Sequence, residues 1–534
     1  MRNLDPASRQ AVQDVIDRHR PALAALPGFV DAEPGFPIVD GQLLREPAIL
    51  VFVDHKRPPD SVLPEDRAPR QLDGLRVAVM QADPLRQLAT QQVFAAQAAQ
   101  ALDAADAGLR YQGIAGDPID RLHAVSTPIL CHVGPDAGWP ALRSFLEGAE
   151  TSLTVAMYDF NADHVANTFI DTVRHQQLAA RLTWDDSMTA PETEIRQRLK
   201  DKLGPLLDGA IVRCGAQRRF ASAYHEKVAV RDSASFWLSS GNWSRRSQPN
   251  IDPVGVPGDA AGMYSKGNRE WHVIVADAPL ARLFERYIEH DLQGSKDELA
   301  AGAPGAALDR AEPQRLPDLF IPMEALMESM AAAAPPRPVA PALLPSTPRS
   351  FQVMPLLTPD NYLKHIVQLI DAATSALYLQ FSYINYSDKK RDADFTRMLQ
   401  RLGERSWEPQ LDMRIIVGSN DASDKIRLLA QAGFNDRVFR KQGGIHNKGI
   451  IVDHRFVLVS STNWSADGVL RNRDAGLLID EPEIAGYYER VFLDDWNRRA
   501  NTRFGDDAPV RLARDGEPTP AGMVRIGWRD YFDG

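Results

Sequence analysis

The chain has 534 residues, which is too long for one hydrophobic core and suggests about three to four domains. Hydrophobic residues make up 44% and charged residues 25% of the chain, as in ordinary globular proteins, and no apolar run has the length of a membrane span. The net charge of -10 excludes a general attraction to nucleic acid or anionic lipid, so such an affinity needs a local basic patch. The N-terminus lacks the apolar core of a secretory signal, and Cys131 and Cys214 are too few for a disulfide scaffold, so we expect a cytoplasmic protein.

Residues 1–125 are predicted to form an accessory α+β domain. An amphipathic helix with Val12, Val15, Ile16 and Leu23 on its apolar face comes first. Strand-like runs follow at 47–55 and 75–83, and then an Ala/Gln-rich helix over about 85–107. This unit carries no catalytic pattern, which favours an accessory role such as docking of a protein partner.

Residues 126–300 and 351–500 carry the same order of elements. A helix pattern at 139–152 leads into a strand at 153–160, and a second at 362–375 leads into a strand at 376–384. The Pro/Ala-rich residues 301–350 between the copies have linker composition, although LPDLFIPMEALMESM within them is apolar enough for a short helix. Residues 501–534 are predicted as a C-terminal tail.

A catalytic-looking motif, HxKxxxxD followed by SSxN, occurs once in each copy. By residue frequency HxKxxxxD should occur at roughly 1 in 20,000 positions, so two occurrences at equal internal spacing indicate an internal duplication. Matching positions lie 221 residues apart: His225 and His446, Lys227 and Lys448, Asp232 and Asp453, Ser240 and Ser461, Asn242 and Asn463.

The spacing of the motif places its histidine and lysine on one face of a strand, because side chains alternate along a strand. An imidazole can act as nucleophile, base or acid near pH 7, and ammonium and amide groups stabilise charge on phosphoryl oxygens. Asp232 and Asp453 fall at hairpin turns, which favours a structural role. The residues Ser460, Ser461 and Thr462 are suited to capping a helix.

The duplicated motif resembles the HKD motifs of the phospholipase D superfamily, and the likeness covers about 126–300 and 351–500. The other histidines of the chain lack metal-ligand spacing such as HExxH, so we predict no catalytic metal and no cofactor. The resemblance implies an α/β fold of two pseudo-symmetric α/β/α lobes whose motifs meet at their interface. It also implies a covalent phosphohistidine on His225, with His446 as general acid and then base. The phosphate would be held by Lys227, Lys448, Asn242 and Asn463. A downstream acid that orients each histidine would be Glu270 or Asp474.

The chain departs from the family pattern at one position of each motif. Ser239 and Ser460 stand where the family usually has glycine, so we expect a slightly altered turn.

The basic residues near the motifs leave the substrate open. They suit a polyanion, although the same residues could be solvated or paired within the protein. With the motif serines, the candidate substrate-binding residues are Ser240, Ser461, Arg218, Arg219, Arg245, Arg269 and Arg473.

Three functions remain open from the sequence. A nuclease is favoured by the basic segments and by aromatic residues that could stack bases, although strand positions favour core packing for most of them. A phospholipase or phosphatidyltransferase is the alternative, and a silent polyanion-binding scaffold is the second. Between Asn242 and Asn268 the first copy has a Pro/Gly-rich insertion at 249–266, which could be a substrate lid. Because one chain has both motifs, no oligomer is required.

Overall fold

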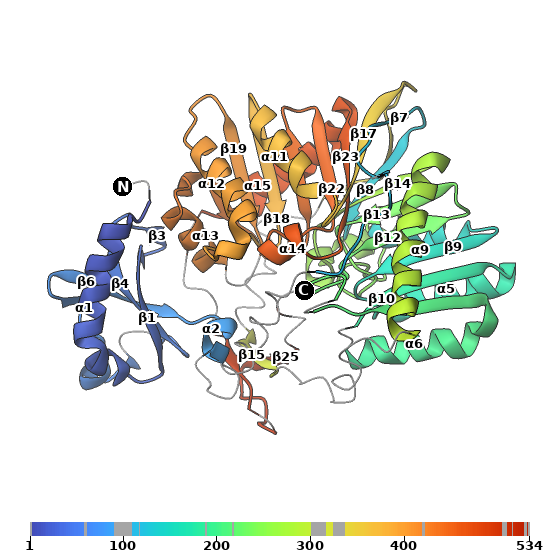
Figure 1. Ribbon diagram of the computed structural model, residues 1–534. Helices are drawn as coiled ribbons and strands as arrows, with labels where there is room; N and C mark the ends of the chain where they lie inside the picture. Colours follow the sequence, from blue (N-terminus) through green and yellow to red (C-terminus); the bar gives the residue numbers. More distant parts are fainter. Residues whose placement is uncertain are drawn as a thin grey trace.

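The structure is a computed structural model. It describes residues 3–57, 61–89, 109–116, 118–186, 189–215, 218–300, 317–323, 337–418, 422–502, 504, 510–514, 516–527 and 531. A small N-terminal unit lies beside two larger sheet-containing lobes, as Figure 1 shows. Among the described residues, no helix combines the length and the apolar character that a bilayer crossing requires.

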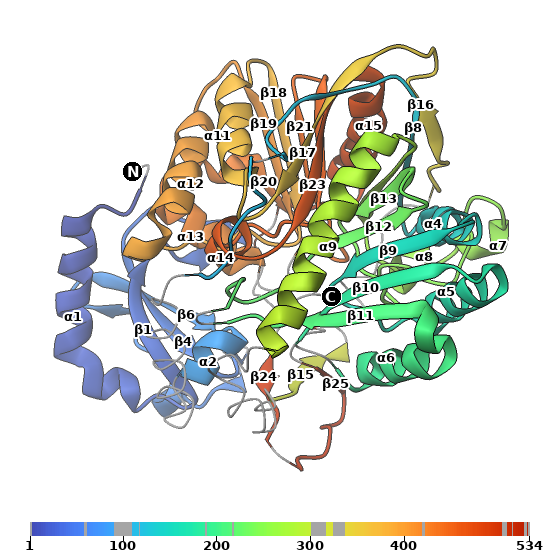
Figure 2. The ribbon, with the colours of Figure 1, turned by 45° about the vertical axis from the view of Figure 1, so that its right-hand side comes forward.

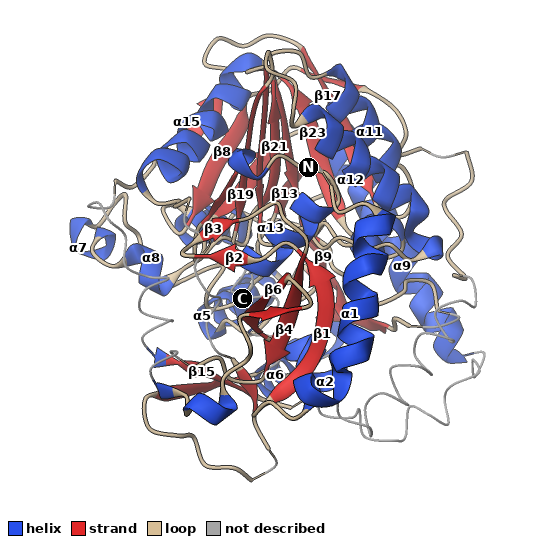
Figure 3. Cartoon of the chain, turned by 90° about the vertical axis from the view of Figure 1, so that its left-hand side faces the viewer, coloured by secondary structure: helices blue, strands red, loops and turns tan. Residues whose placement is uncertain are grey.

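The N-terminal unit is built on a four-stranded sheet of order β1-β4-β6-β5, namely Phe29–Gly35, Ala48–Val53, Leu75–Gln81 and Gln71–Leu72. Helix α1 (Pro6–Ala24) covers one face (Figure 3), and its apolar stripe packs on that face. Asp5 caps α1 by accepting a hydrogen bond from the N–H of Ser8 at 2.9 Å. The helix expected over about 85–107 is described only as α2 (Pro84–Ala89); its remainder lies outside the described residues. A short pair, β2 (Ile38–Val39) and β3 (Gln42–Leu43), completes the unit.

The first lobe is an eight-stranded mixed sheet with helices on both faces. Side chains of β9 alternate: Leu153, Val155 and Met157 pack under the outer helices, whereas Thr154 faces α9 through a hydrogen bond to Glu285. In sheet order the strands are β11 (Leu207–Val212), β10 (Ala179–Asp185), β9 (Ser152–Met157), β12 (Lys227–Arg231), β13 (Ser235–Ser239), β14 (Glu270–Val275), β8 (Ile129–Gly134) and β16 (Ala342–Leu344). The outer helices are α4 (Gly138–Glu147), α5 (Asp163–Gln176) and α6 (Ala190–Leu203), and α9 spans Ala278–Ala300.

The second lobe repeats this arrangement, so the predicted α/β class with two similar lobes is confirmed. In sheet order its strands are β20 (Phe439–Lys441), β19 (Asp412–Val417), β18 (Ala376–Phe381), β21 (Lys448–Val452), β22 (Phe456–Ser460), β23 (Ala475–Asp480), β17 (Phe351–Leu357) and β7 (His123–Val125). Its helices are α11 (Tyr362–Ala372), α12 (Ala393–Arg405), α13 (Ala422–Gln431), α14 (Ala466–Leu470) and α15 (Pro482–Arg498).

The two lobes share one hydrophobic core. Side chains of α9 and α15 join both sheets in a single buried cluster, and Figure 2 shows α9 crossing the middle of the molecule with α15 near its upper end. The lobes also exchange edge strands: β7, before the first lobe, pairs with β17 of the second, and β16 pairs with β8 of the first. The lobes are therefore held together by backbone pairing as well as by apolar burial.

The linker and the tail contribute a third, small sheet. Strand β15 (Leu319–Pro322) pairs with β24 (Arg511–Leu512) and β25 (Met523–Ile526). The prediction of a short helix within LPDLFIPMEALMESM is wrong for residues 319–322. These residues are extended because two strands of the tail pair with them. The rest of that segment lies outside the described residues.

Candidate active site

The two motif histidines are held by backbone hydrogen bonds that cross between the lobes. The N–H of His225 donates to the carbonyl oxygen of Arg473 at 2.7 Å, and the N–H of His446 donates to that of Arg269 at 3.1 Å. Both histidines are buried, at 4% and 1% exposure. Asp474 follows Arg473 in the chain and Glu270 follows Arg269. His225 therefore lies next to Asp474, and His446 lies next to Glu270.

This bridging crosses the two His–carboxylate pairs. Asp474 of the second lobe binds Nδ1 of His225 at 2.7 Å, and Glu270 of the first lobe binds Nδ1 of His446 at 2.8 Å. Each pair fixes its imidazole orientation and leaves Nε2 as the ring nitrogen for chemistry. Neither pair can form within one lobe alone.

The two carboxylates have different surroundings. Glu270 accepts hydrogen bonds from Ser240 at 2.7 Å and from Ser247 at 2.9 Å in addition to its histidine. Burial would raise the pKa of Glu270, but the charge and hydrogen bond of His446 together with the Lys448 ammonium lower it to about 2.

Asp474 is less well compensated. Ser461 donates to its Oδ1 at 2.7 Å, while Oδ2 has no hydrogen-bond partner within the described part of the chain. Burial raises the pKa of Asp474 to about 7, against the opposing charge of Lys227 and the hydrogen bond of Ser461. Burial and the Lys448 charge also lower the pKa of His446, although Glu270 opposes that shift.

The two lysines lie in the same electrostatic environment. Lys448 donates to Nε2 of His446 at 2.9 Å and to the carbonyl oxygen of Ser240 at 3.3 Å, which joins the second motif to the turn of the first. Lys227 donates to the carbonyl oxygen of His225 at 2.8 Å. The positive charges of both lysines act on Asp474, and Lys227 also acts on His446, so the two motifs form one site.

The motif asparagines are buried after the second strand of each hairpin, at 2% exposure for Asn242 and 6% for Asn463. Ser382 donates to Oδ1 of Asn463 at 2.9 Å. In the first lobe the register places Tyr158 where Ser382 lies in the second. Oδ1 of Asn242 has no hydrogen-bond partner among the residues described, and the Tyr158 ring instead packs on His225 with centroids 4.6 Å apart.

Arg269 and Arg473 were predicted to bind substrate, and that prediction is wrong. Arg269 is buried between Asp136 of its own lobe at 2.6 Å and Asp495 of α15 at 2.9 Å. Arg473 is buried in the corresponding way, as described below. Both guanidinium groups form ion pairs that join the two lobes. These pairs position Glu270 and Asp474, the residues that follow the arginines in the chain, and do not hold a phosphate.

Arg473 of the second lobe forms two ion pairs that correspond to those of Arg269 in the first lobe. Arg473 binds Asp291 of α9 at 2.7 Å and Asp360 of its own lobe at 2.7 Å. Arg219, also predicted to bind substrate, is buried and pairs with the same Asp291 at 3.0 Å. Its prediction is wrong for the same reason. The remaining arginines differ: Arg245 is exposed and pairs with Asp163 at 3.0 Å, and half-buried Arg218 lines a cavity outside the site.

The motif serines also differ from expectation. Ser240 and Ser461 were predicted to contact substrate, but their hydroxyls bind the carboxylates of Glu270 and Asp474. They orient those carboxylates because their Oγ atoms also accept the N–H of Trp271 and Ala475, the next residues along. The helix cap expected at 460–462 is formed instead by Ser465, whose side chain accepts from the N–H of Gly468.

Asp232 and Asp453 hold the hairpin turns. Both adopt a left-handed backbone, with φ of 55° and 50°. The Asp453 carboxylate accepts the N–H groups of Thr374, Ser375 and Ala376, and that of Asp232 accepts those of residues 150–152. Each aspartate thus ties its hairpin to the start of the adjacent central strand.

The insertion at 249–266 contains two short helices, α7 (Pro257–Ala260) and α8 (Met263–Lys266). It is anchored by Tyr264, whose ring lies 3.5 Å below the Arg499 guanidinium and whose hydroxyl accepts from Arg269 at 3.1 Å. Val254 and Val256 on the same segment are 41% and 49% exposed. The role of a substrate lid stays a prediction.

Two residues that contact the site, Ser247 and Ser382, were not predicted from the sequence. Ser247 binds Glu270 but has no serine counterpart in the second copy, where Gly468 occupies the matching position. Ser382 lies on the strand before the motif, and only the sheet register brings it to Asn463. No motif spacing signals either residue. Of the described residues, the group with metal-ligand spacing is Asp185, Asp186 and Cys214, and it does not include the motif histidines.

The arrangement can perform phosphoryl transfer by two imidazoles. Oriented Nε2 atoms can serve as nucleophile and as acid or base, and neighbouring ammonium groups stabilise charge on phosphoryl oxygens. The opposite shifts of the two carboxylates, to about 2 and about 7, give the two imidazoles different partners.

Parts of this chain are similar to known proteins. Residues 366–496 match the family described as "Cardiolipin synthase, PLD-like domain". The human mitochondrial cardiolipin hydrolase is 34% identical over 74 residues, which is 14% of this chain and 28% of that protein. The mouse protein is 32% identical over 74 residues and is covered over 32% of its length. The chain thus spans about a third or less of these relatives.

Two solved structures are also similar. Phosphatidylserine synthase of Haemophilus influenzae Rd KW20 is 12% identical, with 71% of this chain and 90% of that chain covered and a TM-score of 0.43. Nuc of Salmonella typhimurium, titled a phospholipase D family member, is 18% identical, with 28% of this chain and 97% of that chain covered and a TM-score of 0.23.

Proposed function

We propose that this chain is a phosphodiesterase of the phospholipase D superfamily that works through a covalent phosphohistidine. The observation that carries the proposal is the crossed pair of His–carboxylate contacts, at 2.7 and 2.8 Å. One substrate phosphorus between two oriented imidazoles is the arrangement that a double displacement requires.

The proposed reaction has two steps. Nε2 of His225 attacks phosphorus, a P–N bond forms, the P–O bond to the leaving group breaks, and His446 gives that oxygen a proton. His446 then takes a proton from water, or from an acceptor alcohol, whose oxygen displaces His225. An anionic substrate favours the protonated form of His446, whose pKa is lowered in the protein alone.

The phosphoryl oxygens are assigned to the lysine and asparagine side chains of both motifs. Two ammonium groups and two amides, from Lys227, Lys448, Asn242 and Asn463, provide the positive and polar partners that the transition state needs. The proposal therefore includes no metal and no organic cofactor.

Nucleic acid is the substrate class that we favour. The exposed Arg245 follows Asn242 closely in sequence, and its partner Asp163 is itself 54% exposed, so this ion pair is weak and open to competition by phosphate. Arg218 and Lys296 add positive charge on the same lobe.

Phospholipid is the second candidate, and a specific observation favours it. Val254 and Val256 are exposed on the insertion at 249–266, as an interfacial loop requires. The matching family and relatives are described as a cardiolipin synthase domain and a cardiolipin hydrolase. A lipid substrate would use the same two-step chemistry.

We also propose a cytoplasmic location, because neither Cys131 nor Cys214 forms a disulfide. The N-terminal unit is proposed as a docking domain; it packs on the second lobe through Arg45, whose guanidinium pairs with Asp436 at 2.6 Å. Its own partner would bind elsewhere on the unit.

A substrate panel in EDTA tests the function. Wild type, His446→Ala and the exposed control His454→Ala should be assayed on single-stranded DNA, RNA, bis(p-nitrophenyl) phosphate and anionic vesicles. We expect cleavage of nucleic acid by wild type and the control, and none by His446→Ala. Headgroup release from vesicles alone would support the lipid function, and binding without any cleavage would support a silent scaffold.

A further inference from the structure

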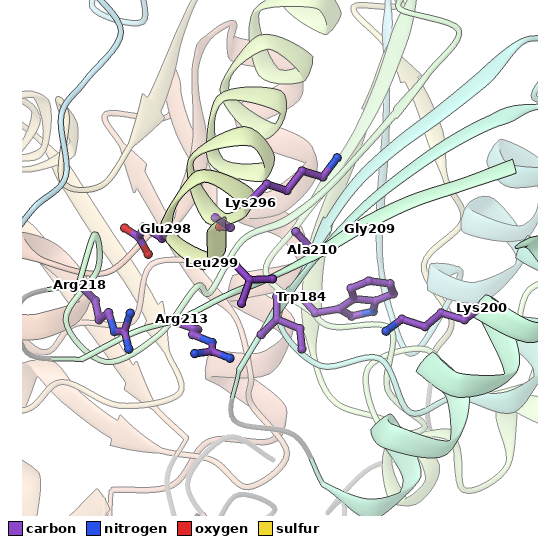
Figure 4. A pocket seen from close by; sticks show the side chains of 11 residues that line it. Trp184, Lys200, Gly209, Ala210, Arg213, Arg218, Lys296, Glu298 and Leu299 are labelled. Atoms are coloured by element: carbon purple, nitrogen blue, oxygen red, sulfur yellow. The ribbon is translucent and has the colours of Figure 1, made fainter. Parts of the chain in front are cut away.

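A cavity on the outer edge of the first lobe is separate from the catalytic histidines. Its volume is about 210 Å³, and it lies between the C-terminal part of α9, the end of α6 and the edge strand β11. Figure 4 shows Lys200 reaching from α6 toward the indole of Trp184, with Arg213 and Arg218 on the opposite side. The catalytic scheme uses none of these four residues.

The cavity is basic although the chain as a whole carries a charge of -10. Four cationic side chains and one carboxylate, Glu298, line it. Lys296 pairs with Asp208 at 2.5 Å, and both side chains are partly exposed, so solvent and ligand can compete for that pair. A concave surface with this excess of positive charge is suited to a phosphate-bearing ligand.

Trp184 forms part of the wall of the cavity, but it is a core residue with 4% of its surface exposed. Its indole packs on Gly209, so closely that a Cβ on that glycine would be 2.6 Å from Cζ3 of the ring. Leu299, which is 71% exposed, adds an apolar contact at the mouth. An apolar part of a ligand can therefore lie against Leu299 next to the cationic side chains.

The cavity is connected to the catalytic site through one segment. Arg213 and Arg218 begin the stretch that ends at His225, and the stretch is closed by the hydrogen bond from the N–H of Gly215 to the carbonyl oxygen of Phe220. The N–H of Tyr224 donates to Asp185 at 2.7 Å, at the end of the strand that carries Trp184. One end of this segment therefore lies at the cavity, and its other end carries His225.

We propose that the cavity is a second binding site for a nucleic-acid strand whose scissile phosphate lies at His225. Lys200, Arg213 and Arg218 contact a phosphate away from the cut, and the neighbouring base or sugar lies against Leu299 at the mouth of the cavity. This inference rests on the proposed function and adds an extended strand to it. A bilayer lipid fits less well, because the rim carries Lys200 and Lys296 and its acyl chains would have to pass them.

The test compares a substrate that reaches both sites with one that reaches only the catalytic site. The long substrate is a 24-nucleotide oligo-dT, and the short one is bis(p-nitrophenyl) phosphate. The variants are Lys200→Glu and Arg213→Gln in the full-length protein. The matched control is Lys202→Glu, because Lys202 is an exposed lysine on the same helix that lies two residues on, about 200° around the helix axis.

We expect Lys200→Glu and Arg213→Gln to reduce kcat/KM on the oligonucleotide by roughly tenfold, mainly through KM, and to leave turnover of the short ester unchanged. The slope of log affinity against log salt should fall by about 0.7 for each lost phosphate contact. The control should match wild type in both assays. If both variants match the control on the long substrate, the inference is overturned.

Two further results separate this inference from the proposed function. If wild type cleaves neither substrate, the proposed function fails, and fluorescence anisotropy with the same labelled oligonucleotide still decides whether the variants have lost a binding site. If Lys200→Glu loses binding to phosphatidylglycerol vesicles but binds the oligonucleotide normally, the cavity holds a lipid headgroup and the inference is overturned.

Discussion

The crossed carboxylates predict that neutralising each one disturbs the histidine of the opposite lobe. Glu270→Gln weakens a charge-assisted hydrogen bond to His446, and Asp474→Asn weakens the one to His225. Such a bond contributes about 1.5–3 kcal/mol, which corresponds to a loss in kcat of roughly 10- to 150-fold. Since His446 assists the second step, Glu270→Gln should let the covalent intermediate accumulate, whereas Asp474→Asn should slow its formation.

The assay is rapid-quench with bis(p-nitrophenyl) phosphate, whose good leaving group needs little acid assistance. A burst of p-nitrophenol followed by slow turnover reports accumulation. Ser247→Ala is the graded control, because it removes one of the hydrogen bonds to Glu270, and it should cost only about fivefold, or about 1 kcal/mol. A burst in Asp474→Asn together with none in Glu270→Gln would refute the assignment of carboxylates to histidines.

Three further predictions concern stability, pH and metals. Arg473→Met leaves Asp360 buried without its guanidinium partner and leaves Asp291 with Arg219, and it should lower the free energy of unfolding by about 3–5 kcal/mol in urea titrations, whereas Arg455→Met at an exposed pair with Asp480 should change it little. Burial raises the pKa of Asp474 to about 7, so kcat should rise with pH through about 7 as the carboxylate ionises and orients His225, and Asp474→Asn should abolish that limb of the profile. The pH dependence of stability has the opposite direction. Asp474 stabilises the folded protein fully below about pH 4, and this contribution is lost as the pH rises through about 7. The free energy of unfolding should therefore fall less between about pH 4 and 7 in Asp474→Asn than in wild type. Dialysis against EDTA should leave the rate unchanged, and a rate restored only by added Mg²⁺ or Zn²⁺ would refute the scheme.

The duplication is the part of the site that the sequence predicts best. The constant separation of 221 residues shows which positions correspond, and the strand period places His446 and Lys448 together. The crossing of the carboxylates could not be derived in this way. It depends on the hydrogen bonds from His225 to Arg473 and from His446 to Arg269, which join segments of different lobes that no local pattern relates.

The basic residues show the limit of reading charge from a sequence. Arg269 and Arg473 stand beside the motifs as substrate-binding arginines would, but their partners Asp495 and Asp291 lie on helices about 180–230 residues away in the chain. The edge strands β7 and β16 could not be predicted from the sequence for a related reason. Each is three residues long, lies next to one lobe in the sequence and pairs with a strand of the other lobe.

The central claim is that both motifs act on one phosphorus and that His225 carries the phosphoryl group. The direct measurement is peptide mapping by mass spectrometry of His446→Ala after incubation with bis(p-nitrophenyl) phosphate at neutral pH. We predict an acid-labile phosphoryl adduct on His225 that is missing from His225→Ala. An adduct on another residue, or no adduct while wild type still hydrolyses the ester, would contradict the claim.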